Sequence, residues 1–263
     1  MDLGLKNKVA LVAGASKGLG YAVALGLARE GARVAILSRD RARIDAAAKE
    51  IRAAAGTEVL PIAADVSRAE DIERAVSETA KKFGTIHILV TNAGGPPPAK
   101  FFDASDEMWQ KAVDQTLMSA VRLSRAAIPL MQKQKWGRIV HITSYTIKHP
   151  IDNLMLSNAI RPAVVGLAKA QSLELGADGI LVNSVGPGIT DTDRIKELFG
   201  DRANRSQASM SEEYARAAKN IPLGRIGQPE EFANVVVFLA SERASFLTGV
   251  YLQIDGGEQR TPF

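Results

Sequence analysis

Three glycines near the start of the chain have the spacing of a phosphate-binding loop. Gly14, Gly18 and Gly20 follow an apolar run and lead directly into a helical pattern. Glycine lets the backbone turn tightly and approach a diphosphate without an intervening Cβ, and the first N–H groups of the next helix attract the anion. The spacing G-x-x-x-G-x-G does not match G-x-G-x-x-G letter for letter. A plain turn is the alternative, but the position between strand and helix favours dinucleotide binding.

Short aliphatic runs alternate with longer helical patterns along the chain and must position this loop. The predicted strands are residues 9–13, 33–37, 58–63, 86–91, 138–143, 180–185 and 250–254. A first predicted helix ends at Arg29, and others cover about 41–55, 69–82, 106–134, 159–176 and 229–240. This alternation predicts an α/β fold with a parallel sheet covered by helices on both faces. Since no Pro/Ser-rich linker divides the chain, one domain is expected over residues 1–263.

The stretch from about residue 190 to 225 is polar, lacks a strand pattern and interrupts the alternation. An insertion there would lie at the carboxyl ends of the strands, where open α/β sheets bind ligands. A substrate-covering lid is the functional interpretation, and a surface helical excursion without a role is the alternative. Arg194, Arg202 and Arg205 in this stretch are candidates for recognising an acidic substrate, but a solvated face is the favoured interpretation.

Several further segments stand in a characteristic order. They are Ala64-Asp65-Val66, Thr91-Asn92-Ala93-Gly94, Gly137-Arg138-Ile139-Val140 before Ser144, Val185-Gly186-Pro187-Gly188 and Ile254-Asp255-Gly256-Gly257. With the glycine loop, they make the chain resemble the short-chain dehydrogenases/reductases from about Lys8 to Gly257. The resemblance implies a three-layer, doubly wound, Rossmann-like sheet of seven parallel strands, NAD(P) binding, and a homotetramer or homodimer.

The resemblance also implies which residues hold the cofactor. Asp65 would meet the adenine and Val66 its ring surface, and Ile189 and Thr192 would bind the nicotinamide amide. The remaining implied cofactor residues are Asn92, Ala93 and Gly94 at the ribose, Pro187 and Gly188 before the nicotinamide site, and Ser16, Lys17 and Leu19 with the three loop glycines. Each Asn or Asp here has a simpler alternative as an ordinary turn former.

The end of the second predicted strand bears on the choice between NAD and NADP. An acidic residue there would accept the ribose 2′-hydroxyl of NAD and repel a 2′-phosphate. The chain instead reads Leu37-Ser38-Arg39, with no acid before Asp40. The forked guanidinium of Arg39 suits a phosphate, and Lys17 adds a second positive charge. Two solvated surface cations are the alternative, but their placement favours NADP(H).

The catalytic positions implied by the resemblance carry unusual residues. The family uses a Tyr and a Lys four residues apart on one helix, with a Ser before them and often an Asn. Here the Ser is Ser144, the Tyr position is Ser157, the Lys position is Arg161 and the Asn position is Thr116. Arg161 can still donate to ribose hydroxyls, but Ser157 is a poorer acid with a shorter reach. Pro162 also lies where the helix should continue, and it removes a backbone donor.

Other groups near Ser144 are candidate replacements. Lys148 is a candidate for the missing ammonium, and His149 is a candidate acid near neutral pH. Tyr145 is a weaker candidate, because neighbouring residues that leave a strand tend to point in opposite directions and Ser144 is expected to point toward the site. Arg161 is also a candidate for stabilising an alkoxide while water supplies the proton.

The leading hypothesis is therefore an NADP(H)-dependent oxidoreductase with an atypical site, acting on a small carbonyl or alcohol substrate by hydride transfer. One alternative is a nucleotide-binding scaffold or sensor without turnover, and another is non-redox chemistry in the cofactor pocket. The 33 Lys and Arg against 29 Asp and Glu give only +4, which calls for neither nucleic acid nor a membrane as partner. The chain has no cysteine, no metal-ligand spacing among its three histidines and no visible secretory signal, so a cytoplasmic protein is expected.

Overall fold

Seven strands form one sheet in which every pairing is parallel. The computed structural model describes residues 1–260, so residues 261–263 of the predicted domain lie outside the described residues. The strands are β1 (Val9–Ala13), β2 (Arg33–Ser38), β3 (Val59–Ala63), β4 (Ile88–Thr91), β5 (Gly137–Ile142), β6 (Ile180–Pro187) and β7 (Tyr251–Ile254). Their order is β3-β2-β1-β4-β5-β6-β7. The predicted single-domain, doubly wound α/β fold is confirmed.

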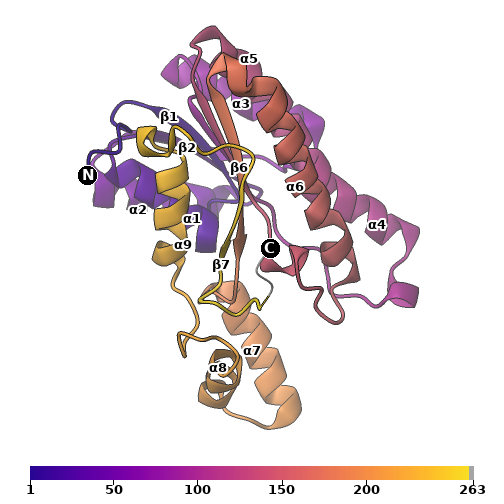
Figure 1. Ribbon diagram of the computed structural model, residues 1–263. Helices are drawn as coiled ribbons and strands as arrows, with labels where there is room; N and C mark the ends of the chain where they lie inside the picture. The colour runs from indigo at the N-terminus through magenta and orange to yellow at the C-terminus, as the bar shows by residue number, and fades with distance from the viewer. Residues whose placement is uncertain (261–263) are drawn as a thin grey trace.

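Helices cover the sheet on both faces and complete three layers (Figure 1). One face carries α1 (Gly18–Arg29), α2 (Arg41–Ala55) and α9 (Pro229–Leu239), and the other carries α3 (Ala69–Phe83), α5 (Ser119–Lys133) and α6 (Met155–Leu175). The two cores follow from the alternation of side chains along each strand. In β1, Ala10 and Val12 face the first group of helices, whereas Val9, Leu11 and Ala13 face the second. Both faces of the strand are thus apolar, as a buried parallel sheet requires.

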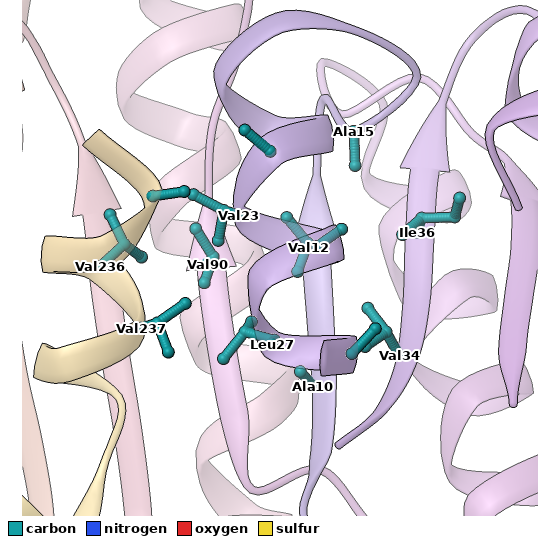
Figure 2. Close-up of a cluster of buried hydrophobic side chains, with 14 of the residues drawn as sticks. Ala10, Val12, Ala15, Val23, Leu27, Val34, Ile36, Val90, Val236 and Val237 are labelled. Carbon is teal, nitrogen blue, oxygen red and sulfur yellow. The ribbon is translucent and has the colours of Figure 1, made fainter. Parts of the chain in front are cut away.

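The first core joins the beginning of the chain to its end. Figure 2 shows Val23 and Leu27 of α1 beside Val236 and Val237 of α9, over β1. A Cβ on Gly26 would lie only 2.9 Å from Cγ2 of Val237, so a glycine at this position allows the two helices to approach closely. The N-terminal segment is also held by the region after α9. The Glu242 amide donates to the carbonyl of Leu3 at 3.0 Å, and Arg243 Nε donates to that of Asp2 at 2.6 Å.

The long helix predicted over residues 106–134 is divided into three parts. It consists of α4 (Asp106–Ala112), a π-helical turn (Val113–Met118) and α5, which continue directly into one another. The Ser119 hydroxyl donates to the carbonyl of Gln115 at 2.6 Å within this wider turn. A π turn is a short widening within an α-helix, and the apolar pattern of the sequence did not mark its position. Short 3₁₀ helices cover Phe101–Asp103, Tyr145–Ile147, Gly176–Asp178 and Glu242–Ala244.

The carboxyl ends of β1 and β4 form the point where the strand order reverses. Connections from β1 lead outward to β2 and β3, whereas β4 leads to β5, β6 and β7 on the other side. Ligands of open α/β sheets bind in the crevice at such a point. The loop of residues 14–20 follows β1, and Asn92 and Gly94 follow β4.

The polar stretch after β6 contains two helices that project beyond the carboxyl ends of the strands (Figure 1). They are α7 (Asp193–Ser206) and α8 (Met210–Ala218), and this pair is called the lid below. Phe199 is buried against Tyr214, with ring centroids 5.1 Å apart, so the two helices share a small apolar contact. A capping box between Ser209 and Glu212 fixes the start of α8. The position agrees with the predicted insertion, and its role as a lid stays a prediction.

Lowering the pH is expected to destabilise this fold through His141. The imidazole is fully buried, with Nδ1 2.7 Å from the Thr91 hydroxyl and Nε2 3.1 Å from Oε1 of Gln171. Burial lowers the pKa of His141 from 6.5 to about 4. At pH values between these two pKa values, His141 binds a proton in the unfolded chain but not in the folded one. The free energy of unfolding therefore falls as the pH drops through this window, by about 2 kcal/mol from pH 6.5 to pH 5.

Urea unfolding of the wild type and of His141→Gln at pH 7 and pH 5 checks this expectation. The variant should lose less stability between the two pH values than the wild type. His87, whose pKa burial also lowers to about 4, contributes in the same direction in both proteins. Identical pH dependence in wild type and variant would remove His141 from the explanation.

Candidate cofactor-binding and active site

The glycine loop after β1 forms an open cradle at the start of α1. Gly14 and Gly18 adopt φ values of 60° and 61°, a left-handed conformation that favours glycine. A Cβ on Gly20 would lie 2.2 Å from the carbonyl oxygen of Gly14, so the loop could not keep its path. No side chain caps the first turn of α1, and no acidic residue lies in it. Its backbone donors therefore remain available for an anion.

Other predicted cofactor residues flank this cradle. Nδ2 of Asn92 donates to the Gly14 carbonyl at 3.2 Å, which joins the loops after β1 and β4. Gln115, which the sequence analysis did not identify, donates to the Gly94 carbonyl at 2.9 Å from the π-helical turn. Ala93 lines a small cavity together with Asn92. Ser16 is half-buried in the loop, whereas Leu19 packs against the core under α1.

The ends of β2 and β3 provide the next part of the site. Arg39 is exposed directly after β2. Asp40 turns toward α2 instead, because its carboxylate accepts the Arg43 amide at 3.0 Å as a helix cap and lies 3.2 Å from the Arg43 guanidinium. Asp65 accepts hydrogen bonds from the amide and hydroxyl of Ser67 through one carboxylate oxygen. Val66 is half-buried beside it and packs against the second core.

The segment after β6 lies against the glycine loop. The Gly188 amide donates to the Ile254 carbonyl at 2.9 Å, while Pro187 ends β6 and the Ile189 carbonyl accepts the Gly227 amide. The Thr192 methyl lies 3.5 Å from the point where a Cβ would stand on Gly18. Thus the predicted nicotinamide segment and the glycine loop meet.

Lys17 joins the same loop to the lid. Its ammonium lies 3.7 Å from a carboxylate oxygen of Asp193 and 3.7 Å from one of Glu197, both in the first turns of α7. All three side chains are substantially exposed, so each ion pair contributes little to stability. The loop and the lid are therefore weakly held together at this point.

Two of the predicted catalytic residues are in direct contact on α6. Arg161 Nε donates to the Ser157 hydroxyl at 3.1 Å, and Arg161 Nη1 donates to the Thr143 carbonyl at 2.5 Å, just after β5. The helix runs unbroken through Pro162. Burial, with the nearby charge of Arg194, lowers the pKa of Arg161 to about 10, so the guanidinium stays charged at neutral pH. A cation is thus fixed at the ends of the central strands.

Ser144 directly follows Thr143, whose carbonyl binds Arg161, but it contacts other groups. Its hydroxyl oxygen accepts the Thr146 amide at 3.2 Å, and its carbonyl accepts the Tyr251 hydroxyl at 2.8 Å. Lys148 is placed on the same side, with its ammonium 5.6 Å from the Tyr251 ring centroid. Ser144 and Lys148 therefore share Tyr251 as a neighbour, whereas Ser157 and Arg161 form a separate pair.

The alternative proton donors differ in their surroundings. Tyr145 is half-buried, and burial, with the charge of Glu258, raises its pKa, so the phenol holds its proton throughout the neutral range. His149 is exposed on the surface. The remaining predicted position, Thr116, lies in the π-helical turn, and its hydroxyl is buried without a hydrogen-bond partner among residues 1–260. Thr116 and Arg161 line the same small cavity as Asn92 and Ala93.

The described residues, 1–260, contain no group of three or more potential metal ligands. Within the same part of the chain, no helix is long and apolar enough to cross a membrane.

Comparisons with known proteins find similarity along nearly the whole chain. A family model described as enoyl-(acyl carrier protein) reductase matches residues 14–259. Dehydrogenase/reductase SDR family member 4 of Oryctolagus cuniculus is 35% identical over 254 residues, covering 96% of this chain and 94% of that protein. The 3-oxoacyl-(acyl-carrier-protein) reductase FabG of Chlamydia muridarum is 33% identical over 253 residues, covering 96% of this chain and 98% of that protein. The crystal structure of L-sorbose reductase from Gluconobacter frateurii, complexed with NADPH and L-sorbose, superposes with a TM-score of 0.97 at 33% identity, covering 99% and 100% of the two chains.

Proposed function

The chain belongs to the short-chain dehydrogenase/reductase family and is an oxidoreductase of that type, and from this premise we propose that it uses NADP(H) to interconvert a small carbonyl compound and its alcohol. The observation that carries the proposal is the cradle between β1 and α1. Its glycines leave room where Cβ atoms would clash, and the uncapped first turn of α1 offers backbone donors to a diphosphate. The residues present therefore fit a dinucleotide.

The preference for NADP(H) rests on the charges at the end of β2. The carboxylate of Asp40 caps α2 and is paired with Arg43, which leaves it poorly placed to accept a ribose hydroxyl. Arg39 is exposed beside it, and Lys17 supplies a second cation in the glycine loop. We propose that these two cations receive the 2′-phosphate. The NADPH in the crystal structure of the L-sorbose reductase supports the same choice.

Replacing Arg39 by alanine is expected to weaken NADPH binding about tenfold or more and to leave NADH binding within about twofold. A lost charge-assisted hydrogen bond of about 1.5–3 kcal/mol corresponds to such a change. Fluorescence titration with each nucleotide measures both dissociation constants. Arg41→Ala is the matched control, because Arg41 is also exposed but is paired with Asp45 at 2.8 Å. Equal loss for both nucleotides would contradict a role in phosphate selection.

For catalysis, we propose that Ser144, Ser157, Arg161 and Lys148 replace the usual Tyr and Lys pair. When bound, the nicotinamide supplies or accepts a hydride. The hydroxyl oxygen of Ser144 accepts the Thr146 amide, so its own O–H remains free to donate to a substrate oxygen. Ser157 is in the same state, because its oxygen accepts Arg161 Nε. The fixed charge of Arg161 stabilises the negative charge that develops on the substrate oxygen, and water provides the proton.

One observation favours a second candidate, a nucleotide-binding scaffold or sensor. Ser157 is only 8% exposed and already bound to Arg161, and its side chain is short. A broad panel of carbonyl compounds with NADPH separates the two candidates. Enzyme-dependent oxidation of NADPH supports the oxidoreductase, whereas tight NADPH binding without any turnover supports the scaffold. A homotetramer or homodimer and a cytoplasmic location remain predictions.

A further inference from the structure

Two guanidinium groups from distant parts of the chain meet at Gly95. Gly95 lies in the loop after β4, Arg161 is on the second turn of α6, and Arg194 is the second residue of α7 in the lid. Nη2 of Arg194 lies 3.5 Å from the point where a Cβ would stand on Gly95, and Nη2 of Arg161 lies 3.7 Å from it. Both guanidinium groups therefore lie beside the same glycine, which presents only a hydrogen atom to them.

The two charges are not balanced by acidic residues. Within residues 1–260, neither arginine has an ion pair with a carboxylate. Arg161 uses Nε and Nη1 on the neutral oxygens of Ser157 and Thr143, which leaves Nη2 without a hydrogen-bond partner among residues 1–260. The neighbouring acids of the lid are engaged elsewhere.

Three carboxylates, two in the lid and one just before it, lie near Arg194 in the sequence. Asp193 and Glu197 pair with Lys17, and Asp191 accepts the Tyr214 hydroxyl at 2.7 Å. The charge of Arg194 lowers the pKa of Arg161, in addition to the effect of burial, which is the direction expected for two cations without an anion between them. A repulsive pair of this kind is stabilised by a bound anion.

The structure assigns this pair to substrate recognition: we propose that Arg161 and Arg194 bind the carboxylate of an oxo acid or hydroxy acid. The inference rests on the proposed oxidoreductase function and narrows its substrate class. The proposed partners of the cofactor phosphates, the start of α1 and Arg39 with Lys17 shared between the phosphate and the lid acids, lie outside this pair. A carboxylate bound by Arg161 and Arg194 would therefore be that of the second reactant. Guanidinium groups suit this task, because their planar forks match the geometry of a carboxylate.

The lid gives this recognition a structural consequence. Arg194 comes from α7, whereas Gly95 and Arg161 belong to the body of the domain. A carboxylate bound by both arginines holds the lid against the loop after β4. A neutral ketone of the same size lacks this link, so acids are selected over their esters.

The test uses matched substrate pairs with the full-length protein and saturating NADPH. Acetoacetate is compared with methyl acetoacetate, and pyruvate with methyl pyruvate, in the wild type, Arg194→Gln and the control Arg205→Gln. Arg205 is an exposed lid residue that donates to the Asp201 carbonyl of its own helix. Arg194→Gln should lower kcat/KM for the acids tenfold or more, change that for the esters less than twofold, and leave the NADPH dissociation constant unchanged. Equal effects on acid and ester, or no effect, would overturn the proposal.

A binding measurement separates failure of this inference from failure of the proposed function. Oxamate, a carboxylate that is not reduced, is titrated calorimetrically into the same three proteins, with and without NADPH. Wild type and Arg205→Gln should bind it at least tenfold more tightly than Arg194→Gln. Lack of oxamate binding, or binding that Arg194→Gln does not weaken, overturns the anion site even if esters are reduced. Loss of NADPH binding and of all turnover, with oxamate binding still dependent on Arg194, overturns the proposed function alone.

A second variant guards against a general disturbance of the lid. Gly95→Ala places a methyl group in ordinary contact with both guanidiniums. It should raise KM for the acids severalfold without changing ester turnover or the thermal unfolding midpoint. Unchanged acid kinetics in this variant would count against a carboxylate at Gly95.

Discussion

Replacing Gly20 by alanine is expected to weaken NADPH binding more than a hundredfold. The new Cβ would stand 2.2 Å from the Gly14 carbonyl oxygen, 2.8 Å from the Gly14 carbonyl carbon and 2.9 Å from Asn92 Nδ2. Two of these atoms are backbone and cannot rotate away, so the loop must shift from the start of α1. The hydrogen bond of Asn92 to Gly14, at 3.2 Å, is then lost as well. Fluorescence titration with NADPH gives the change in dissociation constant.

A helical glycine in open space is the control for this substitution. Gly166 lies on α6, and a Cβ there would meet nothing within 4 Å. Gly166→Ala should therefore bind NADPH as the wild type does and be slightly more stable, because alanine favours the helix by about 0.5–1 kcal/mol. Near-normal NADPH binding by a folded Gly20→Ala protein would show that the cradle does not hold the dinucleotide.

Replacing Arg161 by methionine is expected to lower kcat by about 100- to 1000-fold on any carbonyl substrate that the wild type reduces. This range is typical when a fixed donor to a developing negative charge is removed. Methionine fills much of the same space but leaves the Ser157 hydroxyl and the Thr143 carbonyl without their donor. Some loss of stability is therefore expected too, so kcat and the unfolding midpoint must be measured together.

Arg161→Lys distinguishes a catalytic role of the charge from a structural role of the side chain. Lysine keeps the positive charge but cannot span Ser157 and Thr143 as the guanidinium does. If the charge stabilises the reacting oxygen, Arg161→Lys should retain at least ten times the kcat of Arg161→Met. Equal kcat values in the two variants would assign Arg161 to positioning alone.

The strands and most helices were predictable because their patterns are local. In β1 all five residues are apolar and buried, and the helix predicted over residues 41–55 is α2 without any change of bounds. The π-helical turn at residues 113–118 was missed, since it is a local change of hydrogen bonding that the apolar pattern does not mark. Local patterns thus gave the layers and left this turn to the structure.

The sequence predicted the site only where all the residues that contact one ligand lie in a single segment. The glycine loop is such a segment, because its residue types and its position between strand and helix point to the same ligand. The meeting of Arg161 and Arg194 at Gly95 joins three segments that no single motif connects. Arg194 was a candidate for recognising an acidic substrate, but an exposed arginine in a polar helix is more simply interpreted as a solvated side chain. The pairing of Lys17 with Asp193 and Glu197 was hidden for the same reason.

The packing of α1 against α9 sets the order in which this protein can fold during synthesis. Val23 and Leu27 can pack against Val236 and Val237 only after nearly nine-tenths of the chain has been made. The hydrogen bond between Leu3 and Glu242 can form only later still. Contacts this distant in sequence carry a large loop-closure cost and slow the folding of a domain. One face of the first βα unit therefore stays uncovered while the ribosome is working, and a chain that stops before α9 would expose it permanently.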